Sequence, residues 1–406
     1  MPVDLSAIPD VAQRKRPPLL KRWLVVLLFF LMAGGFLTFW RWPANAPVQG
    51  GMFWHCLISI PLAVWIVAFG VRWLSWLAGE WPAEGWDNAR EQDIANEIQR
   101  GQRFLALGGM SVHLPHAVTS GVLTQQFLLP RGITLPAVVD TPSQAVSYQV
   151  AFSDVGQSPC QRVSRRLKAL LEDNAIRRAL SQRYIVCPLM VVIQSGDDSL
   201  LSTEDRESIK NSISPLLPVS ARVNFLAHFG LAEIDNWLDD PGSIEALLIL
   251  SVNLPAVISA GEGEAAVALL LHFGKDECDD FSIARIHRPE QSSKMTTLHT
   301  SAMQALQWGK TRTEDVAGLW LAGMGTENKA QALLANNNLI FPRVEENAPL
   351  TDIDLKSGYT GAVSPWLAIA LAAGSVGKAP SPQLIMSMPE KSALPWWLIV
   401  HPVPAS

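Results

Sequence analysis

The sequence is poor in cysteine and in charged residues. Its 406 residues include four cysteines (Cys56, Cys160, Cys187 and Cys278), and no two of them have C-x-x-C spacing. This pattern is neither a disulfide framework nor a zinc site, and it agrees with a reducing compartment. Charged residues make up 17% of the chain, and the formal net charge is -5. General nucleic-acid binders are normally basic, so the charge argues against that class and no nucleic-acid partner is predicted.

Several motifs that carry chemistry are also missing. The chain has no Gly-x-x-x-x-Gly-Lys-Ser/Thr phosphate loop, and its serines lack a nucleophile-elbow context. Histidines 272, 287 and 299, taken with Asp279 or Asp280, fit no standard metal-site spacing. The sequence therefore predicts no metal and no cofactor.

Two apolar runs near the start of the chain are its strongest signal. Trp23–Trp40 and Met52–Val71 contain no Asp, Glu, Lys or Arg. A membrane-spanning helix needs about 20 apolar residues, and lipid forces such runs to be helical. A buried core helix is the alternative, but two charge-free runs with interfacial flanks lie close together. A cleaved signal peptide is disfavoured because the first run is long and a second one follows at once.

Basic residues near the ends of these runs predict their orientation. Arg41 is the only Lys or Arg in the connecting loop, residues 41–51. The flanking basic residues are Arg14, Lys15, Arg16, Lys21 and Arg22 before the first run, and Arg72, Arg90, Arg100 and Arg103 after the second. Lys and Arg are retained on the cytoplasmic side. We therefore predict a two-pass protein of the bacterial inner membrane, with both termini and the main domain cytoplasmic.

The chain divides into four predicted parts. They are a cytoplasmic tail at 1–22, a two-helix transmembrane hairpin at 23–76, a juxtamembrane linker helix at 77–103 and an α/β domain at 104–406.

Apolar runs alternate with helical patterns throughout 104–406. The predicted strands are 104–114, 121–129, 184–193, 246–252, 265–273, 316–321, 383–388 and 396–402, and the predicted helices are 162–180, 203–212 with Thr203 as N-cap, 221–238, 301–308, 329–336 and 364–373. The continuous apolar runs are typical of strands buried on both faces. Alternating strands and helices predict a layered α/β fold.

Three short motifs occur in an informative order. They are GEGEAAVALLL at Gly261–Leu271, AGMGT at Ala322–Thr326 and KSGYTGA at Lys356–Ala362. Each alone is most often a turn, since glycine adopts positive φ at no steric cost. Together, their order and spacing resemble the β-ketoacyl synthases of the thiolase-like superfamily, which carry E-G-A-A-A-L-V-L, then H-G-T-G-T, then K-x-x-x-G-H-T-G-A-A-G. The matching residues are Glu262 and Ala265–Leu271, then Gly323, Gly325 and Thr326, then Gly358, Thr360, Gly361 and Ala362, with Lys356 nearby.

The resemblance is clearest over 246–375, and it implies a thiolase-like layered αβαβα domain. It also implies a homodimer, because such domains usually pair through central strands.

The departures from the family pattern carry more information than the matches. That family uses a cysteine nucleophile and two histidines. Ala322 and Tyr359 stand where the histidines are expected, and the region predicted for the nucleophile, Ser220–Asn224, contains no cysteine.

These substitutions predict a thiolase-like domain without its active site. Alanine can neither donate nor accept a proton, and tyrosine is a poor general base near neutral pH. The first hypothesis is therefore a non-catalytic, membrane-anchored binding or adaptor protein. In layout it resembles accessory proteins of type VI secretion that help to load effectors, so the predicted partners are the membrane and a secretion component or effector.

The alternative hypothesis is an acyl-group binding protein or an acyl-transfer enzyme that uses a modified ketosynthase-like pocket. The candidate pocket residues are Ala322, Gly323, Gly325, Thr326, Lys356, Gly358, Tyr359 and Thr360. A third hypothesis is a purely structural membrane component whose soluble domain dimerises.

Overall fold

The computed structural model describes residues 3, 5–43, 48, 50–116, 118, 120–139, 145–154, 156–183, 188–196, 200–226, 229–240, 242–274, 282–294, 298–325, 329, 350–388 and 394–403. The chain forms two compact units. The smaller is Asp4–Glu97, and the larger is Ile98–Ser406 together with Met1–Val3.

The smaller unit consists of two long helices. The first is α1, Leu20–Arg41, and the second begins as α2, Gly51–Trp54, passes through one π-helical turn, η2, at His55–Ser59, and continues as α3, Ile60–Gly101. Both are long and apolar enough to cross a membrane, which confirms the two predicted apolar helices. The 42 residues of α3 extend over about 63 Å, twice the ~30 Å of a hydrocarbon core. The stretch 77–101 therefore continues the second apolar helix without a break.

Close packing joins the two helices within this unit. A Cβ atom on Gly34 would overlap the ring of Pro61, so glycine at 34 lets the helices approach. The indole N–H of Trp65 donates to the backbone carbonyl of Trp23 at 2.8 Å.

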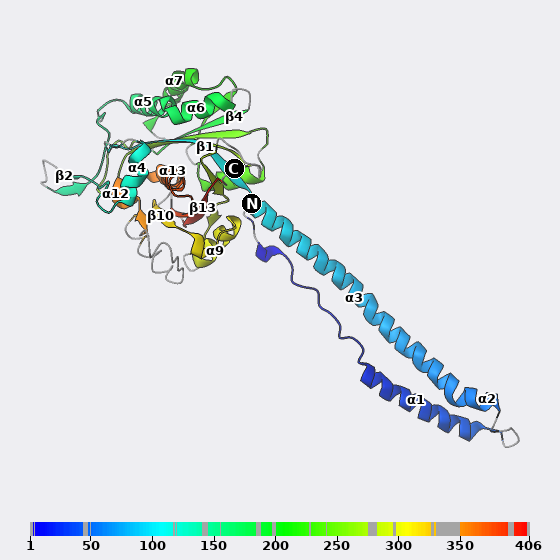
Figure 1. Ribbon diagram of the computed structural model, residues 1–406. Coiled ribbons are helices and arrows are strands. Elements are labelled where there is room, and N and C mark those ends of the chain that lie inside the picture. Colours follow the sequence, from blue (N-terminus) through cyan, green and yellow to red (C-terminus); the bar gives the residue numbers. More distant parts are fainter. Residues whose placement is uncertain are drawn as a thin grey trace. The chain divides into compact units, whose positions relative to one another are not determined.

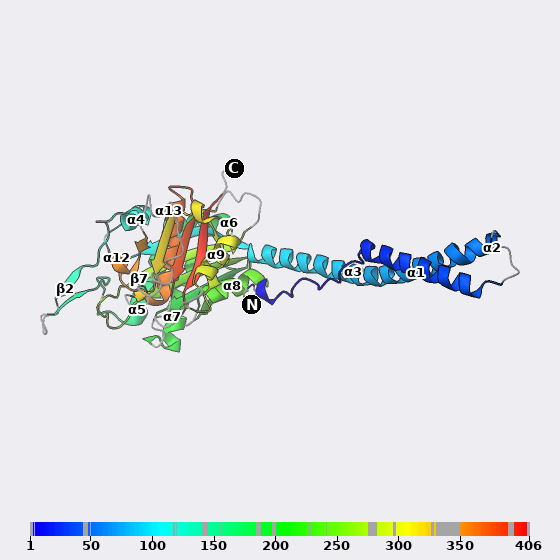
Figure 2. The ribbon, with the colours of Figure 1, turned by 90° about the horizontal axis from the view of Figure 1, so that it is seen from below.

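The larger unit is built on one long mixed sheet. Its strands are β1 (Phe104–His113), β4 (Leu189–Ser195), β5 (Ala221–Phe225), β6 (Ala246–Asn253), β7 (Ala265–Phe273), β8 (Ala284–His287), β9 (Glu290–Gln291), β10 (Gly318–Ala322), β11 (Thr351–Asp352), β12 (Gln383–Ser387) and β13 (Trp396–Pro402). The order is β11-β10-β12-β13-β8-β1-β7-β6-β4-β5, with β9 beside β13. Strands β10, β12 and β13 lie side by side in Figure 2.

The strand order is the same in the two halves of the sheet, counted from each edge inward. From the β5 edge inward, β5, β4 and β6 are parallel, and β7 and β1 follow in antiparallel pairings. From the β11 edge inward, β11, β10 and β12 are parallel, and β13 and β8 follow in antiparallel pairings. The antiparallel pair β1–β8 joins the two halves.

Helices cover both faces of each half. They are α4 (Ser120–Leu128), α5 (Pro159–Glu172), α6 (Asn174–Arg183), α7 (Thr203–Ile213), α8 (Leu231–Asp239), α9 (Leu298–Trp308), α12 (Asp354–Ser357) and α13 (Ser364–Val376). Along β6, Leu247 and Ile249 belong to the core shared with α8 and α13, whereas Leu248 and Leu250 pack with α5 and α7. On β13, Leu398 and Val400 face the inner core, and Trp397 and Ile399 face α9.

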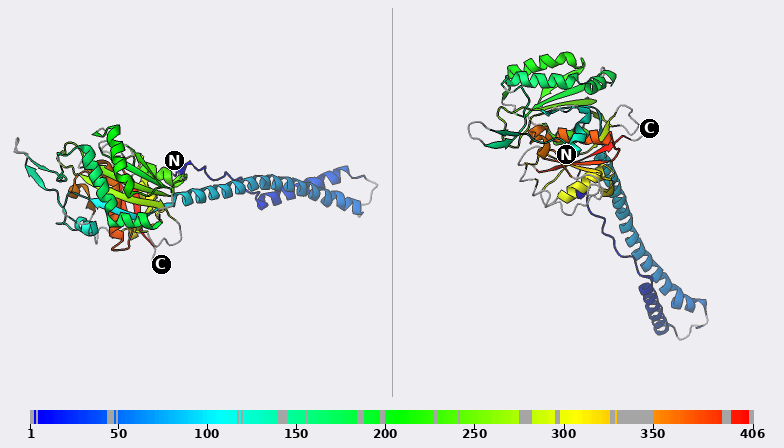
Figure 3. Two further views of the ribbon diagram at one scale, coloured as in Figure 1. Left: turned by 90° about the horizontal axis from the view of Figure 1, so that it is seen from above. Right: turned by 60° about the vertical axis from the view of Figure 1, so that its left-hand side comes forward.

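The result is five layers: α5–α7, the first half of the sheet, the inner helices α8 and α13, the second half, and α9 (Figures 1 and 3). This confirms the predicted αβαβα layering. Helix α13 suits the middle layer because it has no charged residue and is rich in alanine, so both sheet faces can approach it.

Three segments differ from the prediction. Residues 121–129 were expected to form a strand but lie mostly within α4, because Leu123, Thr124 and Phe127 are buried on one face at helical spacing. Residues 221–238 were expected to form one helix. The structure instead has β5 and then α8, since the first five residues alternate in burial and pair in parallel with β4.

The third segment, 162–180, was expected to form one helix. It is divided between α5 and α6 at Asp173, whose side chain accepts the N–H of Ala175 at 3.0 Å and so starts a new helix.

Helix starts are set by local caps. Ser202, not Thr203, is the N-cap of α7, and its side chain and that of Asp205 exchange hydrogen bonds with each other's backbone N–H. At α8 the Glu233 carboxylate accepts the N–H of Gly230 at 2.7 Å. The predicted helix at 329–336 lies outside the described residues except for Lys329.

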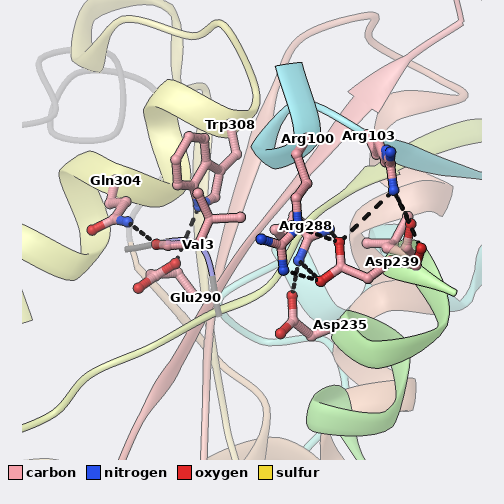
Figure 4. A network of polar contacts seen from close by, with 10 residues as sticks. Val3, Arg100, Arg103, Asp235, Asp239, Arg288, Glu290, Gln304 and Trp308 are labelled. Carbon is pink, nitrogen blue, oxygen red and sulfur yellow. Dashed lines mark hydrogen bonds and ion pairs between the residues drawn. The ribbon is translucent and has the colours of Figure 1, made fainter. Parts of the chain in front are cut away.

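Charged side chains hold the C-terminal end of α8 (Figure 4). Arg288, almost fully buried, donates to Asp235 and to Asp239, each at 2.5 Å. Arg100, in the last turn of α3, makes two further hydrogen bonds to Asp239 at 2.5 and 2.8 Å. Arg103 donates to the backbone carbonyl of Leu238 at 3.1 Å.

These contacts shift the pKa of Asp239. Burial alone would raise that pKa, but the hydrogen bonds and charges of Arg100 and Arg288 outweigh the effect of burial and hold it far below its usual range.

A separate two-stranded hairpin projects from this unit (Figure 1). It pairs β2, Ala137–Val139, with β3, Val146–Tyr148. Its six described residues carry no charge, and all except Ser147 are exposed. The carbonyl of Tyr148, the last residue of β3, accepts the N–H of Gly261 at 2.7 Å, so the base of the hairpin lies next to the first of the three sequence motifs.

Candidate functional site

The three sequence motifs come together in space. The backbone N–H of Tyr359 donates to Gly261 O at 2.8 Å, and Gly263 N–H donates to Tyr359 O at 3.1 Å. The Asn253 side chain, at the end of β6, donates to Gly263 O at 3.2 Å. A Cβ on Gly323 would lie 3.0 Å from that of Ser364, at the start of α13. We call these three stretches, Gly261–Gly263, Ala322–Gly325 and Gly358–Gly361, the motif-loop cluster.

Two glycines in this cluster are required by the backbone. Gly323 has φ +72°, and a Cβ there would overlap the carbonyl oxygen of Met388. Gly358 has φ +78°, and a Cβ there would lie 2.5 Å from the carbonyl carbon of Glu262. Both requirements are steric, so these motif positions are explained by loop geometry before any chemistry is invoked.

An internal carboxylate occupies the hydrogen-bond donors of the second loop. Asp354 accepts the backbone N–H groups of Gly323, Met324 and Gly325 at 2.9, 2.8 and 3.3 Å. Successive N–H groups that converge in this way form an anion-binding nest. Burial raises the pKa of Asp354 to about 6, the nearby Asp352 adds to this, and the three N–H donors oppose it. While Asp354 is ionised, it competes with any external oxyanion for these donors.

The predicted pocket residues have different surroundings. Ala322 is fully buried at the end of β10, and its carbonyl accepts Met388 N–H at 2.9 Å. The Lys356 ammonium donates to the carbonyls of Phe127 and Leu129 at the end of α4, the latter at 2.7 Å. Thr360 is fully buried and shares a 3.0 Å hydrogen bond with Ser364. Thr326 lies outside the described residues.

The region predicted for the nucleophile lies on a strand and not at the start of a helix. Ser220–Asn224 falls on the start of β5, because this stretch is a strand and not the beginning of a helix. By the repeated topology, the segment between β5 and α8, residues 226–230, corresponds in chain order to the segment before α13 that contains Tyr359. Its sequence, LAHFG, also has no cysteine, and residues 227 and 228 lie outside the described part of the chain.

Aromatic rings fill the space beside this loop. The ring of Phe229 stacks on Trp366, with centroids 5.8 Å apart and an interplanar angle of 25°. The Trp366 indole N–H donates to the Gln194 side chain at 3.1 Å, and the Ser251 hydroxyl donates to the same oxygen at 3.1 Å. Buried polar atoms are thus paired with one another.

A buried ionic cluster includes Glu264, the residue of the first motif that directly follows Gly263. Glu264 is fully buried and accepts two hydrogen bonds from Arg162, at 2.6 and 2.8 Å, and one from Phe152 N–H at 2.7 Å. Asp154 accepts from Arg162 at 3.2 Å and from Arg166 at 2.5 Å. Burial alone would raise the pKa of Asp154, but Arg166 and Arg162 hold it below its usual value. The motif match singled out Glu262, which instead accepts Ser259 N–H at 3.0 Å in a turn.

Sequence inspection missed Asp354, Glu264 and Arg162. An acidic residue directly before a buried strand, as in GEGEAAV, is a signal that could have drawn attention to Glu264. Among the described residues, no group of three His, Cys, Asp or Glu side chains could hold a metal ion.

Comparison with known proteins identifies the architecture. No family model matches the sequence, and no curated protein matches it. Among solved structures, "The ishigamide ketosynthase/chain length factor" is 12% identical, with a TM-score of 0.52 over 74% of this chain and 100% of that one. The "PfaC Keto synthase-Chain length factor" is 15% identical, with a TM-score of 0.53 over 74% of this chain and 43% of that one.

A third structure agrees with these two. The entity described as "AntDE:AntF (apo): type II PKS acyl-carrier protein in complex with its ketosynthase bound to the hexaketide" is 11% identical, with a TM-score of 0.52 over 74% of this chain and 100% of that one. At such identities the likeness concerns the fold and not the function. The larger unit of this chain therefore has the thiolase-like mixed α/β fold that its motifs predicted.

Proposed function

We propose that this protein is a membrane-anchored binding protein built on a ketosynthase-like fold that no longer carries out ketosynthase condensation. The observation that carries the proposal is which residues stand in the motif-loop cluster and which group occupies its N–H donors. Ala322 and Tyr359 stand where imidazoles are expected, and the Asp354 carboxylate accepts the N–H donors of the second loop.

The chemistry of condensation supports this proposal. A cysteine thiolate forms the acyl thioester, and hydrogen-bond donors stabilise the negative charge that develops on the carbonyl oxygen. Alanine provides no such donor. A tyrosine hydroxyl, with an ordinary pKa near 10, can donate a hydrogen bond but rarely acts as a base near neutral pH.

An acylation assay tests the proposed loss of chemistry. Full-length protein in nanodiscs is incubated with acyl-thioester and malonyl-thioester substrates and examined by intact-mass spectrometry, with an active ketosynthase as positive control. We expect no covalent acyl adduct and no condensed product. A stoichiometric acyl adduct on this chain would overturn the proposal.

For the partner, we propose a protein of a type VI secretion system, with a role in effector loading. The support is the resemblance in layout and the two apolar helices. Affinity purification of the full-length protein from native membranes, followed by mass spectrometry, tests it. Recovery of spike or effector proteins is the expected result, and a preparation without any secretion component counts against it.

We also propose a homodimer in the membrane, as the fold resemblance implies. Mass photometry of nanodisc preparations at several protein concentrations distinguishes one copy from two. A mass of one chain per disc at every concentration would remove the dimer.

A second function, acyl-group binding, is favoured by one specific observation. A cavity of about 480 Å³ adjoins the buried ionic cluster, and apolar residues are part of its lining. That volume is within the range of small-molecule sites.

A further inference from the structure

The cavity beside the ionic cluster is lined by both apolar and polar residues. It lies where β1 ends and the chain turns. Its apolar lining includes Val112, Leu114, Val118 and Phe152, and its polar lining is His113, Ser153 and Arg166. A volume of about 480 Å³ holds a small organic molecule, and a lining of both kinds suits a molecule with an apolar body and a polar end.

Arg166 gives the polar lining its charge. Its guanidinium lies 3.8 Å from the centre of the Phe152 ring, which fixes it by a cation–π contact. One Nη donates to Asp154 at 2.5 Å. These two contacts hold the guanidinium in place beside the cavity.

Arg166 is the member of the ionic cluster that lines the cavity. Arg162, Arg165 and Arg166 share Asp154, at 3.2, 3.7 and 2.5 Å, and Arg162 also pairs with Glu264. Arg165 is largely exposed, and neither Asp154 nor Glu264 lines the cavity. The charged group at the cavity wall is therefore the Arg166 guanidinium.

His113 is the other titratable residue of the cavity lining. Burial lowers its pKa, Asp173 opposes this and Arg166 adds to it, so the ring is neutral near pH 7. Asp173 itself is held by the Ser111 hydroxyl at 2.8 Å and by Ala175 N–H at 3.0 Å. A neutral imidazole can donate or accept one hydrogen bond without adding charge.

We propose that this cavity binds a small organic anion with an apolar body, namely a carboxylate that pairs with Arg166 while its hydrocarbon part packs against Val112, Leu114 and Val118. The inference rests on the proposed binding function and names its ligand class. The site is separate from the motif-loop cluster but connected to it through Glu264, which joins Arg162 to the strand after Gly263.

Hexanoate and 1-hexanol are the probes that test it. Both have the same hydrocarbon chain, and only the first carries a charge. Isothermal titration uses the full-length protein in nanodiscs, with empty nanodiscs subtracted for partition into lipid. We expect hexanoate to bind at least tenfold more tightly than 1-hexanol, since a charge-assisted hydrogen bond to Arg166 is lost with the alcohol. Equal affinities, or no binding of hexanoate, would overturn the proposal.

Variants locate the binding within the molecule. R166Q should weaken hexanoate binding at least tenfold, and R166K should restore part of it. R165Q is the matched control, because Arg165 lies next to it in α5, also faces Asp154, is largely exposed and does not line this cavity. Hexanoate affinity should be unchanged in R165Q, and unchanged affinity in a folded R166Q would refute the site.

A second variant keeps the test decisive if R166Q does not fold. V118F places a larger side chain in the cavity lining without removing an ion-paired residue, and it should abolish hexanoate binding. Retention of full affinity in V118F would contradict the cavity. Failure of hexanoate to bind leaves the loss of ketosynthase chemistry untouched, because the acylation assay measures that separately.

Discussion

The two halves of the sheet share one strand order but differ in where they bury charge. The first half holds Arg162, Asp154 and Glu264 against its outer helices, and Asp235 and Asp239 at the end of its inner helix α8. The inner helix of the second half, α13, has no charged residue. The second half buries Arg288, directly after β8, and places Asp354 in a backbone nest. The topology is therefore duplicated and the polar groups are not, so features specific to this protein are found among the buried charges.

The largest effect is expected from breaking the first-half ionic cluster. R162M leaves Glu264 buried without its partner, and we expect a loss of about 3–5 kcal/mol in the free energy of unfolding. Urea unfolding of the nanodisc-embedded protein, followed by tryptophan fluorescence, measures it. R165Q, which removes a largely exposed arginine, should cost under about 1 kcal/mol. Equal stabilities of the two variants would show that the cluster does not stabilise this half.

A smaller effect is expected in the second-half nest. G323A forces an alanine into positive φ and against the Met388 carbonyl, so we expect a loss of about 3 kcal/mol. Gly325 is the matched control. It also has positive φ, but a Cβ there meets nothing within 4 Å, so G325A should cost only about 1 kcal/mol. The same unfolding assay compares them, and a G325A loss equal to that of G323A would exclude the steric explanation.

The nest should also make stability depend on pH. The pKa of Asp354 is about 6 in the folded protein and near 3.9 when unfolded, so the folded state binds this proton more tightly. Its contribution is therefore favourable below about pH 4 and is lost as pH rises through 6. Part of the side chain contacts solvent, so we expect on the order of 1–2 kcal/mol.

D354N removes this titration. Urea midpoints at pH 4.5 and 7.5 should differ less in D354N than in the unchanged protein. Identical pH dependence in both would mean that Asp354 does not titrate in this range.

The smallest effect is expected at the end of α8. R100Q removes two hydrogen bonds to Asp239 but leaves Arg288 in place, so we expect a loss of about 1 kcal/mol. R103Q removes contacts to backbone carbonyls from a side chain that is about half exposed, and it should cost about 0.5 kcal/mol or less. Hydrogen exchange at residues 231–239 reads the local effect, and faster exchange in R103Q than in R100Q would reverse this ranking.

The sequence predicted the parts of the fold that depend on local pattern. The runs at 246–252 and 265–273 became β6 and β7, and 364–373 became α13, because a fully buried strand or helix needs a continuous apolar sequence. The motif order identified the fold, and the three loops do meet. Residues 121–129 were misassigned because a short apolar run has no decisive period.

The polar clusters could not be predicted in the same way. Arg162 and Glu264 are 102 residues apart, and nothing in either local sequence indicates the other. Asp354 precedes the third motif, but its partners follow β10, about 30 residues earlier. Such contacts depend on which strands become neighbours, which a single sequence does not specify. The roles of the eight predicted pocket residues stay a prediction.

The repeated strand order predicts that this protein can be assembled from two separately produced fragments. A cut between Phe273 and Ala284 would give one fragment with β1 and β4–β7 and another with β8 and β10–β13, each an entire copy of the pattern. The pair β1–β8 and the shared inner core would then be an interface between two polypeptides. Co-expression of the two fragments as separate genes should therefore yield a reassembled complex, and the same cut site offers a natural position for new chain termini.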